Sequence, residues 1–166
     1  ENLVYRSMAF LFNEAGSKIP ALKISCHNNI PMSRGLGSSS AAIATGLVAA
    51  NELCETEFTA NDLLEMATTI EGHPDNVAAS LLGGLHLVVA EDQHIFPVAI
   101  GVPPEMRAVL FIPECRISTG ASREVVPKKV SMSDAVHNMS RTALLVAGFA
   151  TNHPEYLAVA TQDRLH

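Results

Sequence analysis

Residues 31–42, with the sequence PMSRGLGSSSAA, join two segments of different character. The run before them, Leu22–Cys26, alternates apolar and polar side chains and predicts a strand within residues 19–30. The alanine-rich run after them, Ala41–Leu53, predicts a helix. Glycine lets a backbone approach a ligand closely, and the free N–H groups at the start of a helix attract negative charge. The stretch therefore predicts a phosphate-binding loop.

Two well-known phosphate loops fit this stretch poorly. The P-loop requires a lysine after its glycines, and none is present. The dinucleotide fingerprint G-x-G-x-x-G/A is matched loosely by Gly35, Gly37 and either Ser40 or Ala41. It also needs an acidic residue at the end of the next strand, for which Glu55 and Glu57 have the spacing. Because a new helix is expected from Thr59 with no strand before it, this fingerprint is a weak alternative.

The loop resembles the G-L-G-S-S-[AS]-A loop of the GHMP small-molecule kinases more closely. Pro31, Gly35-Leu-Gly-Ser-Ser39 and Ala41 stand where that family has them. The alternative is a glycine-rich turn that caps a helix and binds no ligand. A single G-x-G would not distinguish this structural turn from a phosphate-binding loop.

Composition limits the class of protein. The 166 residues are 48% hydrophobic and 17% charged, which is typical of a globular chain with a real core. A net charge of −6 without a basic patch argues against nucleic-acid binding. No apolar run reaches the ~18 residues of a membrane span. Three cysteines without metal-ligand spacing indicate a reducing, cytoplasmic environment.

Sequence patterns predict an α+β domain in two layers. Helices are expected over residues 3–15, 38–55, 59–71, 75–82, 118–124, 131–149 and 157–165, and strands over 19–30, 85–90, 95–100 and 106–112. Thr59 and Asp62 have the spacing of a capping box. Helices followed by strands and then by helices again indicate an α+β fold rather than a regular alternation of strand and helix.

A second cluster of polar residues lies at the turn between two of these helices. Glu71-Gly-His-Pro-Asp-Asn76 places four functional side chains within six positions. Phosphoryl transfer needs metal ligands and a group that orients the attacking hydroxyl. Glu65 or Glu71 can hold Mg²⁺, Asp75 can accept a hydrogen bond from a substrate hydroxyl, and Asn76 can position it. The alternative is structural: Asp75 and Asn76 cap a helix, and His73 is a turn residue.

Together with the loop, this cluster resembles one group within the GHMP family, the bacterial homoserine kinases. Residues 71–84 resemble their E-G-H-P-D-N-V-x-x-x-x-x-G-G signature. Weaker matches follow: residues 118–127 resemble T-x-x-A-R-x-x-L-P, residues 134–138 resemble D-A-V-x-N, and residues 162–166 resemble the start of Q-D-x-L-H-Q-P-Y-R. The resemblance covers essentially the whole chain.

The resemblance implies a partial GHMP kinase fold. Residues 1–103 would form part of an N-terminal, ribosomal-protein-S5-like ATP-binding domain, and residues 104–166 would begin a C-terminal α+β domain. The family's chains are nearly twice as long, and this chain neither opens with methionine nor ends on a terminating signal. We therefore expect an internal piece of a longer protein, with an incomplete substrate site.

The resemblance also implies a role for each site residue. ATP phosphates would be bound by the loop residues Pro31, Met32, Ser33, Arg34, Gly35, Leu36, Gly37, Ser38, Ser39, Ser40 and Ala41. Mg²⁺ would be held by one serine of the loop, which by position is Ser39, with Ser38 and Ser40 as alternatives. Its carboxylate ligand would be Glu65, which lies well upstream of Asn76 on the preceding helix; Glu71, inside the signature, is the competing ligand. Asp75 and Asn76 would be catalytic, and L-homoserine would contact His73, Asp75, Asn76 and Arg123.

The implied reaction is the ATP-dependent phosphorylation of the side-chain hydroxyl of L-homoserine, a step toward threonine. ATP and Mg²⁺ are the implied cofactors, and a cytoplasmic homodimer is the implied state. Two alternatives remain open: a GHMP kinase acting on a different small alcohol, and a nucleotide-binding module without turnover.

Overall fold

The computed structural model describes residues 2–92, 94–112, 114 and 126–165 of the chain. The chain forms two units, residues 1–98 and 99–166. The domain boundary expected between residues 103 and 104 remains a prediction.

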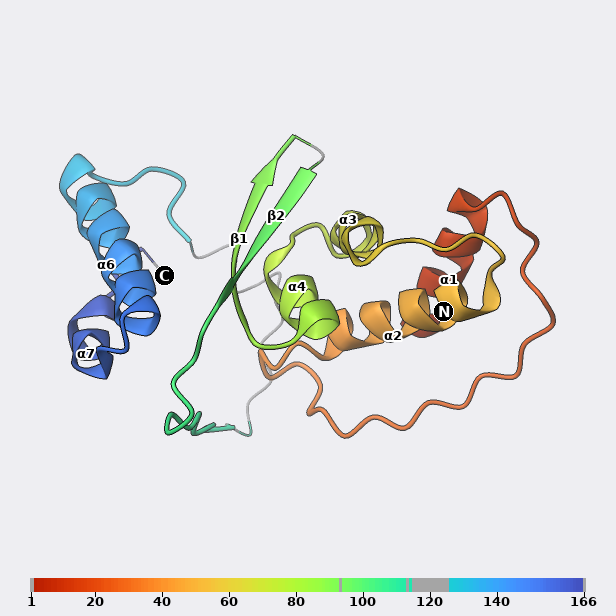
Figure 1. The fold of residues 1–166 in the computed structure, drawn as a ribbon, viewed down its shortest axis with the longest axis horizontal. Helices are drawn as coiled ribbons and strands as arrows, with labels where there is room; N and C mark the ends of the chain where they lie inside the picture. Colours follow the sequence, from red (N-terminus) through yellow and green to blue (C-terminus); the bar gives the residue numbers. More distant parts are fainter. Residues whose placement is uncertain (1, 93, 113, 115–125, 166) are drawn as a thin grey trace. The chain divides into compact units, whose positions relative to one another are not determined.

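The first unit combines helices with a small sheet (Figure 1). In their order along the described chain, its elements are α1 (Leu3–Glu14), α2 (Ser38–Leu53), α3 (Ala60–Glu71), α4 (Asp75–Leu82), β1 (Leu85–Glu91) and β2 (His94–Ile100). The two strands form an antiparallel hairpin whose turn follows Glu91. This mixture of helices and antiparallel strands confirms the partial α+β fold.

Local signals in the sequence set the ends of α3. Thr59 is the N-cap: its hydroxyl accepts a hydrogen bond from the Asp62 backbone N–H at 3.2 Å, and the Asp62 carboxylate accepts one from the Thr59 N–H at 2.7 Å. The predicted capping box is thereby confirmed, and the Thr59 side-chain hydrogen bond lowers the pKa of Asp62. At the other end, Gly72 adopts a left-handed φ of 88° and stops the helix after Glu71.

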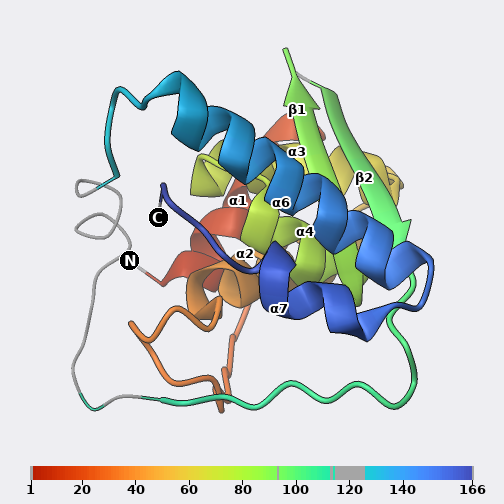
Figure 2. The same cartoon turned by 90° about the vertical axis from the view of Figure 1, so that its left-hand side faces the viewer.

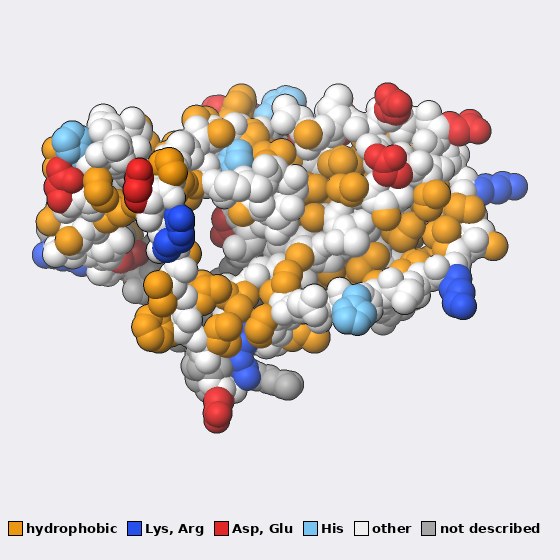
Figure 3. Space-filling view, turned by 60° about the horizontal axis from the view of Figure 1, so that its bottom comes forward, with side chains coloured by type: hydrophobic (Ala, Val, Ile, Leu, Met, Phe, Trp, Pro, Cys, Tyr) orange, Lys and Arg blue, Asp and Glu red, His pale blue; other side chains and the backbone are white. Residues whose placement is uncertain are grey.

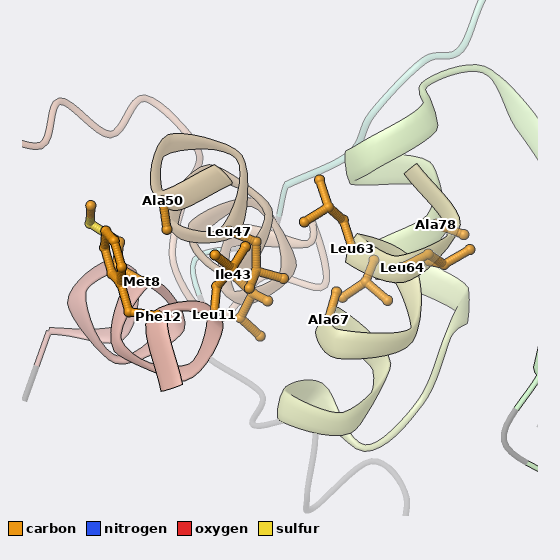
Figure 4. Packing of buried hydrophobic residues seen from close by; sticks show 11 residues of the cluster. Met8, Leu11, Phe12, Ile43, Leu47, Ala50, Leu63, Leu64, Ala67 and Ala78 are labelled. Carbon is orange, nitrogen blue, oxygen red and sulfur yellow. The ribbon is translucent and has the colours of Figure 1, made fainter. Parts of the chain in front are cut away.

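The core of the first unit lies between the four helices. Figure 4 shows side chains of α1 and α2 pointing toward each other, with those of α3 beside them. The buried cluster consists of Met8, Leu11, Phe12, Ile43, Leu47, Ala50, Leu63, Leu64, Ala67, Val77 and Ala78. This packing fixes α2, and with it the end of the glycine-rich loop, relative to the end of α3.

Gly46 permits the close approach of α1 and α2. A Cβ atom at this position would lie 2.4 Å from the Val4 carbonyl oxygen and 2.8 Å from the Ser7 Cβ. Alanine inside a helix is ordinarily more favourable than glycine by up to ~1 kcal/mol. Any loss of stability on replacing Gly46 with alanine must therefore come from this clash. We expect Gly46→Ala to lower the free energy of unfolding by about 1–3 kcal/mol in urea denaturation.

A matched control for this substitution is Gly101→Ala, because a Cβ at Gly101 meets no atom of the described residues within 4 Å and the φ there is outside the left-handed region. If the two variants unfolded at the same urea concentration, α1 and α2 could not pack as closely as described.

The hairpin buries one side and exposes the other. Val88 and Ile95 pack against the helical core. The alternating positions Leu87, Val89, Phe96 and Val98 are 38–53% exposed. Figure 3 shows hydrophobic side chains on the surface of the molecule. The helices of the first unit therefore cover only one side of the hairpin.

Two predicted strands are absent from the described residues. The segment 19–30 belongs to no helix or sheet, although Leu22 packs against the core. Residues 106–112 are likewise outside any strand. A strand requires a hydrogen-bonded neighbour, and among the described residues the sheet consists of β1 and β2 alone. The strands predicted from alternation in these two segments are therefore wrong for the described residues.

The second unit is helical in its described part: α6 (Met132–Ala150), the 3₁₀ helix η1 (Pro154–Tyr156) and α7 (Leu157–Ala160). Ser131 caps α6 by accepting a hydrogen bond from the Asp134 N–H at 3.1 Å, which confirms the expected start. Figure 2 shows α6 and α7 side by side. The helix expected over 118–124 lies outside the described residues.

The last helix is shorter than the predicted range 157–165, because the chain after Ala160 is bonded to α6 instead. The Asn138 amide donates to the Asp163 carboxylate at 2.7 Å, and its oxygen accepts from the Arg164 N–H at 3.0 Å. In the part of the chain that the structure describes, no helix is long and apolar enough to cross a membrane.

Candidate active site

The glycine-rich loop leads directly into α2. Three of its residues have left-handed backbone: Ser33 at φ 57°, Gly35 at 69° and Gly37 at 71°. Gly37 is the N-cap of α2 and provides no side-chain hydrogen bond to the first turn. The N–H groups of that turn are therefore not satisfied by a capping side chain, which is the arrangement that favours an anion.

A carboxylate from α3 meets the first turn of α2. The Ser39 hydroxyl donates to Glu71 Oε2 at 2.9 Å, and the Ser40 hydroxyl donates to Glu71 Oε1 at 3.2 Å. Ser40 is buried, and the Glu71 side chain is only 13% exposed. The first bond spans 32 positions of the sequence and the second spans 31, so together they join the loop to the signature segment.

The signature segment continues this arrangement around the turn. His73 Nε2 lies 4.0 Å from Glu71 Oε1, and His73 Nδ1 is in hydrogen-bond contact with Asp75 Oδ1. The same Asp75 oxygen accepts the Asn76 backbone N–H at 2.7 Å. Asp75 and Asn76 begin α4, as the sequence predicts. Predicted site residues from both motifs are thus brought together.

Glu65, the first choice for a metal ligand, has different surroundings. Its carboxylate lies 3.4 Å from Nδ1 of His94 on β2, and the two side chains are 41% and 77% exposed. Glu71 contacts both serines of the loop instead. The contacts therefore favour Glu71, the competing residue in the sequence, as the carboxylate that acts together with Ser39.

Two arginines were expected at the site. Arg34 lies in the loop, and its Nη1 atom is buried without a hydrogen-bond partner among the described residues. A guanidinium with an unused buried donor fits an anionic ligand. Arg123 lies outside the described residues.

The dinucleotide alternative disagrees with the order of elements. Between α2 and α3 the described residues 54–59 contain no strand, so Glu55 and Glu57 do not stand at a strand end. The required strand–helix–strand unit is absent there.

The oxygen donors at the junction fit magnesium. Mg²⁺ is bound in nucleotide-dependent enzymes by one or two carboxylates together with substrate phosphates, and hydroxyl and carboxylate oxygens suit it. Ser39 and Glu71 supply such a pair beside the loop. Within the described ranges, no group of three or more His, Cys, Asp or Glu side chains is arranged to hold a metal by itself. The donor set therefore fits a metal whose remaining ligands come from a nucleotide and from water.

Comparison with known proteins gives a consistent result. The model of the GHMP kinases N terminal domain matches residues 2–84, half of the chain. The homoserine kinase of Clostridium beijerinckii is 44% identical over 100% of this chain and 56% of its own length. That of Desulfitobacterium hafniense is 45% identical over 99% of this chain and 56% of its own length. The chain thus spans about 56% of the length of these curated relatives.

Solved structures show the same relationship. A crystal structure of homoserine kinase from Cytophaga hutchinsonii matches with a TM-score of 0.79 and 27% identity over 99% of this chain and 53% of that one. A putative homoserine kinase from Listeria monocytogenes matches with a TM-score of 0.75 and 28% identity, over 98% and 54% of the two chains. With its phosphate loop, its signature segment and a family model that matches half of its residues, the chain belongs to the GHMP kinase family.

Proposed function

We propose that the full-length protein containing this chain transfers the γ-phosphoryl group of ATP to the side-chain hydroxyl of L-homoserine, and that it acts in threonine biosynthesis in the cytoplasm. The observation that carries the proposal is the pair of hydrogen bonds from Ser39 and Ser40 to Glu71. They join a GHMP phosphate loop to the E-G-H-P-D-N segment, and relatives that are 44% and 45% identical to this chain are named homoserine kinases.

The residues of the loop bind the phosphates in this proposal. Backbone N–H groups at the start of α2 and the Arg34 guanidinium supply positive charge where the nucleotide's negative charge lies. Ser39 and Glu71 hold Mg²⁺, which when bound neutralises charge on the transferred phosphoryl group.

The residues of the signature segment bind the acceptor. Asp75 accepts a hydrogen bond from the homoserine hydroxyl and orients its oxygen, and Asn76 holds the same group from the first turn of α4. Arg123 binds the substrate carboxylate in two-point fashion. Because the transition state of phosphoryl transfer is loose, orientation of the hydroxyl contributes more than removal of its proton. Residues 1–103 and 104–166 belong to two domains, and the homodimer implied by the resemblance remains a proposal.

The test is ADP release by the full-length protein with Mg²⁺-ATP and a panel of alcohols. Homoserine should support release, whereas mevalonate, galactose and shikimate should not. Release with another alcohol would support a GHMP kinase of different specificity. A folded protein that binds ATP and releases ADP with none of them would be a nucleotide-binding module.

Removal of the Ser39 hydroxyl is expected to weaken the use of Mg²⁺-ATP. We expect Ser39→Ala to raise the Mg²⁺ concentration needed for half-maximal activity on the order of 10-fold, because the metal loses one oxygen ligand. Titration of ADP release with Mg²⁺ at saturating homoserine measures the effect.

Thr45→Ala is the matched control for that titration, because it removes one hydroxyl from the same helix, and that hydroxyl donates to the Ala41 carbonyl oxygen and lies outside the loop. An unchanged Mg²⁺ dependence in Ser39→Ala would remove Ser39 from the metal ligands.

A further inference from the structure

Asn51 joins the far ends of the two helices that carry the candidate site. Its Oδ1 atom accepts a hydrogen bond from the Phe58 backbone N–H at 3.0 Å, and its Nδ2 atom donates to the Phe58 carbonyl oxygen at 3.1 Å. Asn51 lies in the last turn of α2, and Phe58 directly precedes Thr59, the N-cap of α3. One side chain therefore ties the end of α2 to the start of α3.

The contact depends on the carboxamide group of Asn51. The Phe58 N–H requires an acceptor and the Phe58 carbonyl oxygen requires a donor, and the asparagine side chain supplies one of each. The contact is partly buried, and Phe58 packs against the helical core. An apolar residue at position 51 would leave the backbone groups of Phe58 without these partners, which is unfavourable where water is partly excluded.

A second connection closes the opposite ends of the same helices. Ser39 and Ser40, in the first turn of α2, donate to the carboxylate of Glu71, the last residue of α3. At a rise of 1.5 Å per residue, the helix extends about 18 Å from Ser39 to Asn51. The helices α2 and α3 therefore run antiparallel, with a hydrogen-bonded connection at each end.

The connection at Asn51 constrains the position of α3 along its own axis. The core between the helices contains apolar side chains such as Leu47 of α2 and Leu64 of α3, and apolar burial is non-directional. A hydrogen bond, in contrast, weakens steeply with misalignment. If α3 slides as a unit, Glu71 moves by the same amount as the start of the helix. A misplacement of about 1 Å at a site can cost on the order of 10²-fold in rate.

From this arrangement we propose that Asn51 is a positioning residue: its carboxamide sets the axial register of α3 against α2 and thereby holds the Glu71 carboxylate against the hydroxyls of Ser39 and Ser40. The inference rests on the proposed function, because it assigns what places the metal-binding carboxylate for that reaction. Asn51 acts through Phe58 and α3 and contacts no ligand itself.

Stability of the full-length protein, measured without ligand, tests this connection. Asn51→Leu removes both bonds to Phe58 and keeps a branched side chain, and Glu71→Ala removes the bonds from the two serines. Urea unfolding of the unchanged protein, the two single variants and the double variant forms a double-mutant cycle. The effect of Glu71→Ala should be markedly smaller in the Asn51→Leu background, because the bonds of Glu71 are already weakened once α3 has slid.

Two further variants complete the cycle. Asn51→Ala should give the same coupling to Glu71→Ala and replaces the leucine variant if that variant does not fold. Gly46→Ala, which disturbs the other side of α2, should leave the effect of Glu71→Ala unchanged. Equal effects of Glu71→Ala with and without the Asn51 carboxamide would overturn the proposal, since distant sites without a connection are additive.

The Mg²⁺ dependence of ADP release gives a second readout. Asn51→Leu should raise the Mg²⁺ concentration for half-maximal activity on the order of 10-fold, because the metal-binding carboxylate is displaced. Gly46→Ala should not change that concentration. A purely structural role of Asn51 would reduce the amount of folded protein and leave the Mg²⁺ dependence of the remainder unchanged, which would also contradict the proposal.

The two readouts separate this inference from the proposed function. If homoserine supports no ADP release but Asn51 and Glu71 are coupled in stability, the reaction is wrong and the positioning role stands. If homoserine is phosphorylated but the two positions are additive, the reaction stands and the positioning role is wrong.

Discussion

Replacing Glu71 with glutamine is expected to lower kcat/KM for Mg²⁺-ATP by on the order of 10²- to 10³-fold in the full-length protein. Glutamine keeps the size of the side chain; its amide oxygen can accept a hydrogen bond from one of the two serine hydroxyls, and its NH₂ group can donate to the other. It removes the negative charge that a magnesium ligand provides, and metal stabilisation of transferred charge is worth several kcal/mol. Homoserine-dependent ADP release, measured over a range of Mg²⁺ concentrations, gives the result.

Glu65→Gln is the matched control, on the same helix and with the same chemical change. The Glu65 carboxylate is 41% exposed and lies beside His94, so we expect an effect many times smaller than that of Glu71→Gln. The opposite order, with Glu65→Gln inactive and Glu71→Gln active, would restore the first choice made from the sequence. Equal thermal unfolding of the two variants excludes a difference in folding.

Asp75 is expected to be the second position at which a single substitution removes most of the activity. We expect Asp75→Ala to lower kcat for homoserine by about 10²- to 10⁴-fold, because the group that orients the hydroxyl is lost. Asp75→Asn should also lower kcat strongly, since the amide lacks the negative charge of the acceptor. Initial rates at saturating homoserine and Mg²⁺-ATP measure both.

The comparison between the two substitutions separates orientation from proton removal. An asparagine variant with nearly full rate would show that Asp75 is not a proton acceptor, because an amide cannot take up the hydroxyl proton. Full activity in the alanine variant would remove Asp75 from the site altogether. ATP binding by both variants, followed with a fluorescent nucleotide, is expected to stay unchanged.

The helices of the first unit could be predicted from local signals. The Thr59–Asp62 capping box and Gly72 act within a few residues of the helix ends that they set, so the sequence carries them directly. Strand formation in the segment 19–30 could not be predicted in this way. Its alternating side chains favour extended backbone, but a strand also depends on a neighbouring segment, and that dependence is not local.

The choice between Glu65 and Glu71 shows the same limit within the site. Both lie on α3, but six residues correspond to about 240° of rotation around a helix, so the two carboxylates project in different directions. Which direction meets Ser39 depends on how α2 packs against α3, and that is decided by the core. The sequence held one signal in favour of Glu71: this residue lies inside the E-G-H-P-D-N segment, next to the turn that positions His73 and Asp75.

The most direct test of the central claim is identification of the phosphorylated product. The full-length protein is incubated with Mg²⁺, L-homoserine and ATP that carries ¹⁸O in its γ-phosphoryl group, and the products are separated by mass spectrometry. We predict O-phospho-L-homoserine that carries the labelled phosphoryl group, formed in equal amount to ADP. ADP accompanied only by labelled inorganic phosphate, with homoserine unchanged, would contradict phosphoryl transfer to homoserine.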